Sequence, residues 1–183
     1  IVKWQKSSDA LFTSPIDIAN TTTTLTGASI GNLTATTYYR AFVTSGSCSS
    51  ATSGTATVTV SPASVAGTIS GGGVTVCTGT NSTGLTLSGH TGSITRWESS
   101  LDNFATAGTT IANTSTTQTA TNLTATTYYR AVLTSGSCAA ANSATATVTV
   151  SPASVGGSIA GSATVSTGTN STGLTLSGHT GTI

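Results

Sequence analysis

Three cysteines are the residues of this chain with the clearest chemical potential. Cys48 and Cys138 stand 90 residues apart in matching surroundings, and Cys77 occupies a second position whose next copy is Ser166. If each repeat is built for one cysteine pair, Cys77 and Cys138 belong to the same repeat, and we predict a disulfide between them. Closing a loop of about 60 residues would stabilise the fold by roughly 3–4 kcal/mol in the chain-entropy model. The alternative is three free thiols, which holds if Cys77 lies at the far end of its strand and the pair fails on distance.

Few other side chains could bind a metal or catalyse a reaction. Zinc needs about four converging ligands. The chain has three cysteines, and His90 lies in a Gly-rich turn, so we expect no zinc site. The carboxylates are Asp9, Asp17, Glu98 and Asp102. Asp102-Asn103 offers one candidate calcium ligand, but a turn-forming Asx pair is the simpler interpretation.

The two histidines, His90 and His179, each follow a glycine, with another glycine two residues on. A base or ligand is one interpretation, and a polar turn residue is the one we favour. No Ser–His–Asp set and no facing carboxylate pair has a supporting motif. We therefore expect no enzyme activity, no metal and no cofactor.

The composition is poor in charge and rich in hydroxyl groups. Charged residues make up 5% of the 183 residues and the formal net charge is +1, whereas an ordinary soluble domain has about 25% charged residues. Such a chain has no basic patch to which nucleic acid or an anionic membrane could bind. No apolar run approaches the roughly 20 residues of a membrane-spanning helix. We expect no nucleic-acid partner and no membrane insertion by this segment.

The chain repeats itself with a period of roughly 90 residues. Gly84–Gly92 returns unchanged as Gly173–Gly181, and Asn32–Arg40 returns as Asn122–Arg130. The joint Ser61-Pro62-Ala63-Ser64 also has a later copy, and its proline suits a short, stiff hinge. A repeat protein is therefore predicted.

The period divides the chain into three segments. Residues 1–61 are expected to be the C-terminal two-thirds of one repeat, residues 62–150 a complete repeat, and residues 151–183 the N-terminal third of the next. Ile1, Ile94 and Ile183 occupy the same repeat position. We therefore expect these residues to be a window on a longer array.

Short alternating runs bounded by Gly, Ser, Asn and Pro predict strands throughout, and no segment predicts a helix. In the complete repeat the strands are expected near residues 67–70, 74–78, 84–88, 94–99, 109–111, 118–123, 127–134 and 144–150. In the first segment they are expected around Trp4 and near residues 21–26, 33–43 and 56–60. This pattern predicts an all-β fold of tandem immunoglobulin-like or fibronectin-III-like β-sandwich repeats.

The alternation also assigns side chains to faces. In Arg96-Trp97-Glu98 the tryptophan is expected to point inward and the two charged side chains outward. We predict core anchors, each burying on the order of 150–250 Å², at Trp4, Trp97, Tyr39 and Tyr129. The candidate surface contacts are Tyr38, Tyr128 and Arg130.

These residues carry a family resemblance that covers the whole chain. The runs Leu85–Gly89, Arg96–Ser100, Leu123–Ala131 and Ser135–Cys138 resemble the Ig-like repeats of giant Bacteroidota cell-surface adhesins, in particular those of gliding motility. The resemblance implies an extracellular filament attached at the outer membrane, exported by the type 9 secretion system and carried by the gliding machinery. The family supplies no catalytic residues.

Two functions are open at this stage. In one, the repeats form a structural stalk whose partners are neighbouring repeats and the gliding or secretion machinery. In the other, each repeat is a weak binding module for polysaccharide or another extracellular surface. Aromatic residues are only 5% of the chain, which is low for a sugar binder and favours the stalk.

Overall fold

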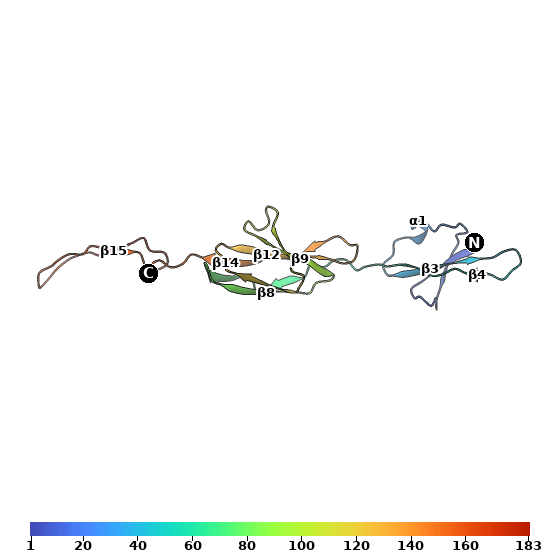
Figure 1. The fold of residues 1–183 in the computed structure, drawn as a ribbon, viewed down its shortest axis with the longest axis horizontal. Helices are drawn as coiled ribbons and strands as arrows, with labels where there is room; N and C mark the ends of the chain where they lie inside the picture. Colours follow the sequence, from blue (N-terminus) through green and yellow to red (C-terminus); the bar gives the residue numbers. More distant parts are fainter. The chain divides into compact units, whose positions relative to one another are not determined.

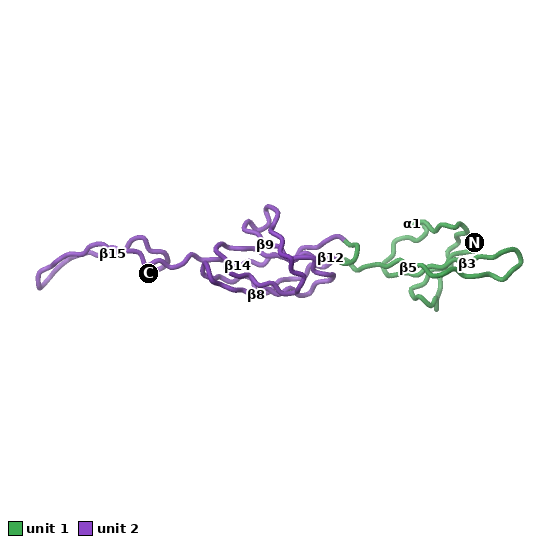
Figure 2. Tube along the Cα trace, in the orientation of Figure 1, with its two compact units in different colours: residues 1–63, 135–138 green, residues 64–134, 139–183 purple.

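The computed structural model describes all 183 residues and is almost entirely β-structure. Sixteen strands and one short helix, α1 (Gly27–Ile30), make up its regular structure (Figure 1). The chain forms two compact units: Ile1–Ala63 with Ser135–Cys138, and Ser64–Thr134 with Ala139–Ile183 (Figure 2). No helix of the chain has the length and apolar character that a membrane span requires.

The second unit contains a large sheet built around β12. The strands are hydrogen-bonded in the order β10 (Thr109–Ile111), β9 (Ser93–Ser100), β12 (Thr127–Thr134), β14 (Ala146–Ser151) and β7 (Val74–Cys77), and β13 (Ala141–Asn142) also pairs with β12. All pairs are antiparallel except β14 with β7, which is parallel. Strand β12 is central because its β-branched and aromatic residues fit a strand with neighbours on both sides.

A smaller antiparallel sheet covers the inner face of the large one. Its order is β11 (Thr117–Thr121), β8 (Ser82–Ser88) and β6 (Thr68–Ser70). In β8 the residues alternate, so that Leu85 and Leu87 are buried while Thr86 and Ser88 are exposed. The alternation of apolar and hydroxyl residues thus places one face in the core and the other in solvent.

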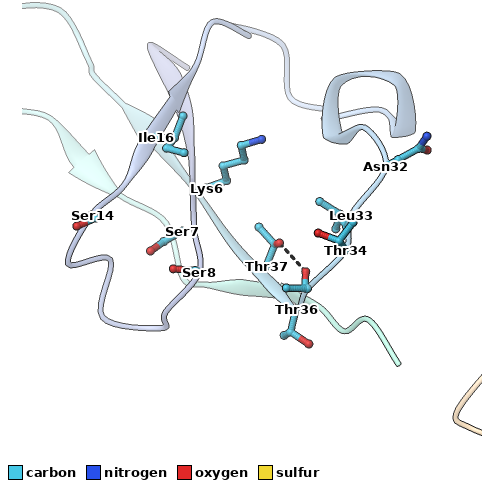
Figure 3. Close-up of a pocket in the computed structure, with 11 residues that line it drawn as sticks. Lys6, Ser7, Ser8, Ser14, Ile16, Asn32, Leu33, Thr34, Thr36 and Thr37 are labelled. Atoms are coloured by element: carbon cyan, nitrogen blue, oxygen red, sulfur yellow. Dashed lines mark hydrogen bonds between the residues drawn. The ribbon is translucent and has the colours of Figure 1, made fainter. Parts of the chain in front are cut away.

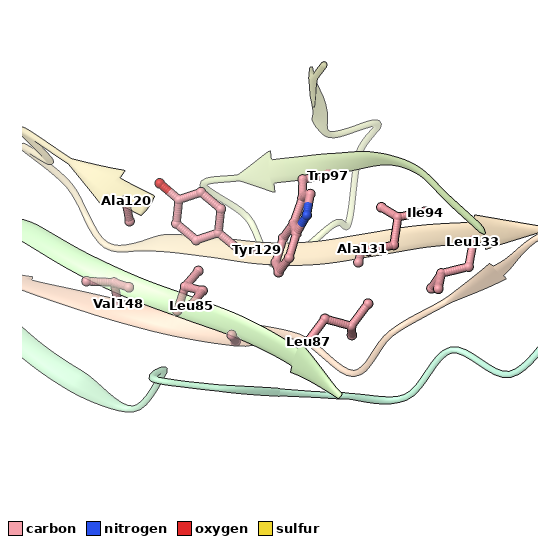
Figure 4. Close-up of a cluster of buried hydrophobic side chains, with 10 residues drawn as sticks. Leu85, Leu87, Ile94, Trp97, Ala120, Tyr129, Ala131, Leu133 and Val148 are labelled. Atoms are coloured by element: carbon pink, nitrogen blue, oxygen red, sulfur yellow. The ribbon is translucent and has the colours of Figure 1, made fainter. Parts of the chain in front are cut away.

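The core lies between these two sheets, so this part of the chain is a β-sandwich. Figure 4 shows side chains from both sheets converging on Trp97, which is fully buried. The buried cluster consists of Leu85, Leu87, Ile94, Trp97, Ala120, Tyr129, Ala131, Leu133, Ala146 and Val148. Each fully buried leucine contributes about 1.5–3 kcal/mol relative to an exposed one.

The first unit contains a single sheet with the same plan as the large sheet. The order is β2 (Ile16–Ile18), β1 (Lys3–Ser7), β3 (Thr37–Val43) and β4 (Ala51–Thr52), and β5 (Ala56–Val58) also pairs with β3. Strands β1 and β3 correspond to β9 and β12 of the sandwich, since Trp4 faces Ala41 as Trp97 faces Ala131.

Two expectations for the first segment were wrong. The Thr-rich stretch at residues 21–26 forms no strand, and α1 follows it where no helix was expected. In the second unit the corresponding strand, β11, exists because it pairs along its whole length with β8. Residues 1–61 contain no counterpart of β8. Without that partner a strand here would leave its backbone groups unpaired, and the short helix bonds them locally instead.

Residues 151–183 form a two-stranded ladder of β15 (Ser158–Ala160) and β16 (Thr175–Ser177). Its register repeats that of β6 with β8, with Ile159 opposite Leu176 as Ile69 is opposite Leu87. A glycine follows the first strand of each ladder. At Gly71 the backbone has φ of 87°, and an added Cβ would lie 2.1 Å from the Gly84 carbonyl oxygen, so only glycine fits there.

Candidate functional site

The predicted disulfide is not formed: all three cysteines are free. Cys77 ends β7 opposite Ser151, on the side of the sheet where β12 begins. Cys138 comes four residues after the other end of β12, at Thr134. The two thiols are separated by the length of an eight-residue strand, roughly 25 Å at about 3.3 Å per residue. A disulfide requires Cα atoms within about 7 Å, so the pairing was wrong for reasons of distance.

Cys138 instead contributes to the first compact unit, in the turn Ser135–Cys138. Its Sγ lies 3.4 Å from the carbonyl oxygen of Pro62 and 3.7 Å from that of Ser61. The same turn brings Gly136 so close to Ser61 that a Cβ there would clash with the serine side chain. The repeated Ser-Gly-Ser-Cys sequence therefore forms a close contact with the Ser-Pro joint.

The four predicted core anchors differ in burial. Trp97 and Tyr129 lie in the core of the sandwich, and Tyr39 is buried in the first unit. Trp4 is only partly buried, because the first unit has no second sheet to cover it. Both indoles donate a hydrogen bond to a loop carbonyl: Trp97 Nε1 to Ser115 at 2.9 Å, and Trp4 Nε1 to the corresponding Thr22 at 3.1 Å.

A buried carboxylate lies on the outer face of the large sheet. Glu98 is 5% exposed, although alternation predicted it to face outward beside Arg96. Its carboxylate accepts hydrogen bonds from Arg96 Nε and Arg130 Nε, each at 2.7 Å. A charge is buried in this way only when it is paired, and here two guanidinium groups satisfy it.

The loop that covers this ion pair starts at the end of β9. Phe104 stacks on Arg130, with the guanidinium carbon 4.0 Å from the ring centroid. Asn103 and Phe104 have φ of 55° and 62°, a left-handed conformation that requires support. The Ser100 hydroxyl supplies it by accepting a hydrogen bond from the Phe104 amide at 2.9 Å. Asp102 secures the far side, since Thr106 donates to it through both its amide at 3.0 Å and its hydroxyl at 2.6 Å.

These contacts stabilise the ionised carboxylates. Hydrogen bonds from Ser100 and Thr106 lower the pKa of Asp102 to about 2. Burial alone would raise the pKa of Glu98, but the hydrogen bonds and charges of Arg130 and Arg96 outweigh it, and its pKa lies below the ordinary value. Both pKa shifts favour the ionised carboxylate, which is the form that the arginine and hydroxyl donors bind.

The first unit contains a cluster that matches the one around Glu98, but its carboxylate comes from a different strand. Arg40 lies over Phe12, with its guanidinium carbon 4.1 Å from the ring centroid. Gln5 stands in the place of Glu98 and accepts two hydrogen bonds from Arg40. The carboxylate is supplied by Asp17 on the neighbouring strand, which binds Lys3 Nζ and Gln5 Nε2 at 2.7 Å each.

The loop in the first unit is held by the same polar residue types. Asp9 accepts hydrogen bonds from Ser7 and Thr13, as Asp102 does from Ser100 and Thr106. Of the chain's nine charged residues, five basic and four acidic, all except Lys6 thus belong to the two clusters. The charges of this chain serve mainly to fasten one loop in each unit.

Sequence reasoning missed the roles of Phe12, Phe104 and Glu98. A signal was present: the spacing Ser-x-Asp-x-x-x-Thr occurs at Ser7–Thr13 and again at Ser100–Thr106. The simpler interpretation of Asp102 as a turn residue agrees with its contacts. The two clusters hold no group of three or more His, Cys, Asp or Glu side chains that could bind a metal ion, and neither does the rest of the chain.

The candidate surface contacts are only partly exposed. Tyr38 and Tyr128 are each half-buried on the outer sheet faces. Arg130 is taken up by Glu98 and Phe104, so its guanidinium is a structural group. His90 lies in the turn between β8 and β9, next to Thr91, which exchanges backbone hydrogen bonds with Val65.

A cavity of about 310 Å³ opens in the first unit (Figure 3). It lies between β1, where Lys6 and Ser7 line it, and residues 32–37, which form the loop before β3 and its first residue. In the sandwich, the corresponding loop is bound by Asn81, which donates to the Leu123 carbonyl at 2.9 Å and accepts from its amide at 3.0 Å. Residues 1–61 contain no counterpart of Asn81, so this part of the sheet is open.

The comparison with known proteins points to one family. No curated protein matches the chain. A family model described as "Domain of unknown function (DUF8696)" matches residues 1–62 and again residues 65–152. The chain therefore belongs to the DUF8696 family.

Proposed function

We propose that this chain is a stretch of structural stalk, built from tandem Ig-like β-sandwich repeats in a long secreted cell-surface adhesin filament. The observation that carries the proposal is the position of the charged side chains. In both units these side chains pair with one another and hold one loop against the sheet, with Arg130 over Phe104 in one unit and Arg40 over Phe12 in the other. The arginine and phenylalanine are the same in both units, whereas the carboxylate is Glu98 on β9 in one and Asp17 on β2 in the other. Residues that keep the same contacts while the position of the charge changes suit a structural role.

The topology supports the Ig-like part of the proposal. In an Ig constant-type domain, strands A, B and E share one sheet and strands C, F and G the other, with a buried Trp on strand C. Here β6, β8 and β11 form one sheet and β9, β12 and β14 lie in the other, and Trp97 is buried on β9.

The surface supports a stalk that resists adhesion along its length. The outer face of the small sheet carries hydroxyl side chains at alternate positions, such as Thr86, Thr117 and Thr119. These groups hydrogen-bond well with water and carry no charge, so their interactions depend little on salt. The stalk would then support adhesion and gliding by displaying an adhesive tip that lies elsewhere in the filament. The proposals of gliding motility and of type 9 secretion rest on the family resemblance.

The competing proposal makes each repeat a weak binder of polysaccharide or another surface. Sugars stack on exposed aromatic rings, and Tyr38, Phe42 and Tyr128 each offer only part of a ring on the outer sheet faces. The test is adsorption of the fluorescently labelled chain to glass and to agar polysaccharide, with an inert β-sandwich of equal charge as the reference. The stalk proposal predicts no excess adsorption. Saturable adsorption that is lost in Tyr128→Ala, but kept in the loop variant Leu101→Ala, would replace the stalk with the binding module.

A further inference from the structure

The strands by which the chain enters and leaves the large sheet of the sandwich lie side by side. Strand β7 is the first strand of that sheet in chain order and β14 is the last. They pair in parallel, with Val74 opposite Val148 and Cys77 opposite Ser151. The chain therefore enters the pair at the Val74 end and leaves it at the other end, after Ser151.

This arrangement determines how tension acts on the pair. A pull on the two ends of the chain draws β7 back toward Val74 and draws β14 forward past Ser151, in opposite directions along the strand axes. The strands can then separate only by sliding, which loads the evenly spaced backbone hydrogen bonds of a parallel pair together. In an antiparallel pair the entry and the exit would lie at the same end, and the bonds would open one after another.

Backbone hydrogen bonds hold the pair at both ends. The Gly73 amide donates to the Thr147 carbonyl at 2.7 Å where the pair begins, and the Thr78 amide donates to the Ser151 carbonyl at 2.9 Å where it ends. Between them, the side chain of Val76 packs against the buried core of the sandwich. Sliding of β7 along β14 must therefore break backbone bonds and core contacts in the same step.

We propose that β7 and β14 form the contact that carries tension through the sandwich, and we call this strand pair the clamp. The inference rests on the proposed stalk function and adds to it the contact that determines the unfolding force. Forced unfolding is governed by the rate of unfolding. The force should therefore depend on the direction of the pull, although the fold and its equilibrium stability are the same.

The test stretches one protein in two directions with optical tweezers. In the double variant Cys48→Ser and Cys138→Ser, Cys77 is the remaining thiol, and it is exposed and can carry a handle. A pull between the two chain ends slides β7 along β14, whereas a pull between Cys77 and the C-terminus opens the pair from Ser151. The unfolding force should be roughly two to four times higher in the first direction, because four residue pairs share the load there.

Two variants at Thr78 test the backbone bond itself. Thr78→Pro removes the amide that donates to Ser151, whereas Thr78→Ala removes the side chain and keeps the amide. The force measured between the chain ends should fall in Thr78→Pro and stay unchanged in Thr78→Ala.

The outcomes separate the clamp from the stalk. A discrete unfolding event at the same force in both directions would overturn the clamp and leave the stalk in place. An equal fall in force in the two Thr78 variants would also overturn the clamp, since the backbone bond would then make no difference. Smooth extension in both directions would contradict the stalk, and the clamp with it.

Discussion

Glu98→Gln should destabilise the sandwich because it removes the buried carboxylate with which Arg96 and Arg130 pair. The wild-type carboxylate accepts two hydrogen bonds at 2.7 Å, from Arg96 and Arg130. A hydrogen bond to a charged group contributes about 1.5–3 kcal/mol and a neutral one about 0.5–1.5 kcal/mol. Arg96 is 42% exposed, so its share is reduced by solvent, and the expected loss is about 1–2 kcal/mol. For a repeat of this size that lowers Tm by roughly 5–15 °C.

The first unit shows how the loss can be repaired. There Gln5 occupies the Glu98 position and Asp17, its neighbour across the strand pair, supplies the charge. The residue that corresponds to Asp17 is Thr110, which lies opposite Glu98. Thr110→Asp should therefore recover about half of the lost stability, roughly 1 kcal/mol, in the Glu98→Gln variant. In the presence of Glu98 the same change should destabilise, since it places a second carboxylate beside the first.

The assay is urea unfolding followed by fluorescence of Trp97 in a Trp4→Phe background, so that only the sandwich is reported. Four chains form the cycle: the parent, each single variant, and the double variant. A Glu98→Gln chain as stable as the parent would refute the account of the buried ion pair. A Thr110→Asp effect of the same sign and size in both backgrounds would refute the exchange of carboxylates between strands.

Three further predictions follow from the same contacts. Phe104→Ala should lower stability by about 1 kcal/mol through lost stacking and speed proteolysis at residues 101–108, whereas Leu101→Ala, at 70% exposure, should change neither. The pKa of Asp102 is about 2 in the folded chain and about 3.9 in the unfolded chain. Its ionised carboxylate therefore stabilises the fold above pH 4, and this stabilisation is lost as the pH falls from 4 to 2. Thermal unfolding across this range should show a smaller decrease in Tm for Asp102→Asn than for the parent chain. Leu85→Ala should cost about 2–5 kcal/mol in urea unfolding, while the same change at its exposed copy Leu174 should stay within about 0.5 kcal/mol in dilute solution.

Local alternation was enough to predict most of the sandwich. The expected strands at residues 109–111 and 127–134 match β10 and β12, and the others differ by a few residues at their ends. Trp97 and Tyr129 lie in the core where period-2 alternation placed them. These features depend on side chains within one strand, so the sequence pattern contains them.

Features that depend on distant partners could not be predicted in this way. Residues 21–26 have the composition of a strand, but a strand also needs a neighbour, and the first unit has none at that edge. Cys77 and Cys138 belong to one repeat, yet only the direction of β7 along β14 shows that they lie at opposite ends of the sheet. Glu98 is buried because a loop folds back over it, which alternation within β9 cannot reveal.

The central claim, that these repeats are structural units of a stalk, is tested most directly by stretching single molecules of the whole chain. The sandwich matched by the family model spans residues 65–152, and 88 residues extend to about 300 Å. The account predicts one discrete unfolding event that lengthens the chain by nearly that amount, at a force that falls in Glu98→Gln. Smooth extension without a discrete event would contradict it, because a repeat that cannot hold tension cannot serve as a stalk.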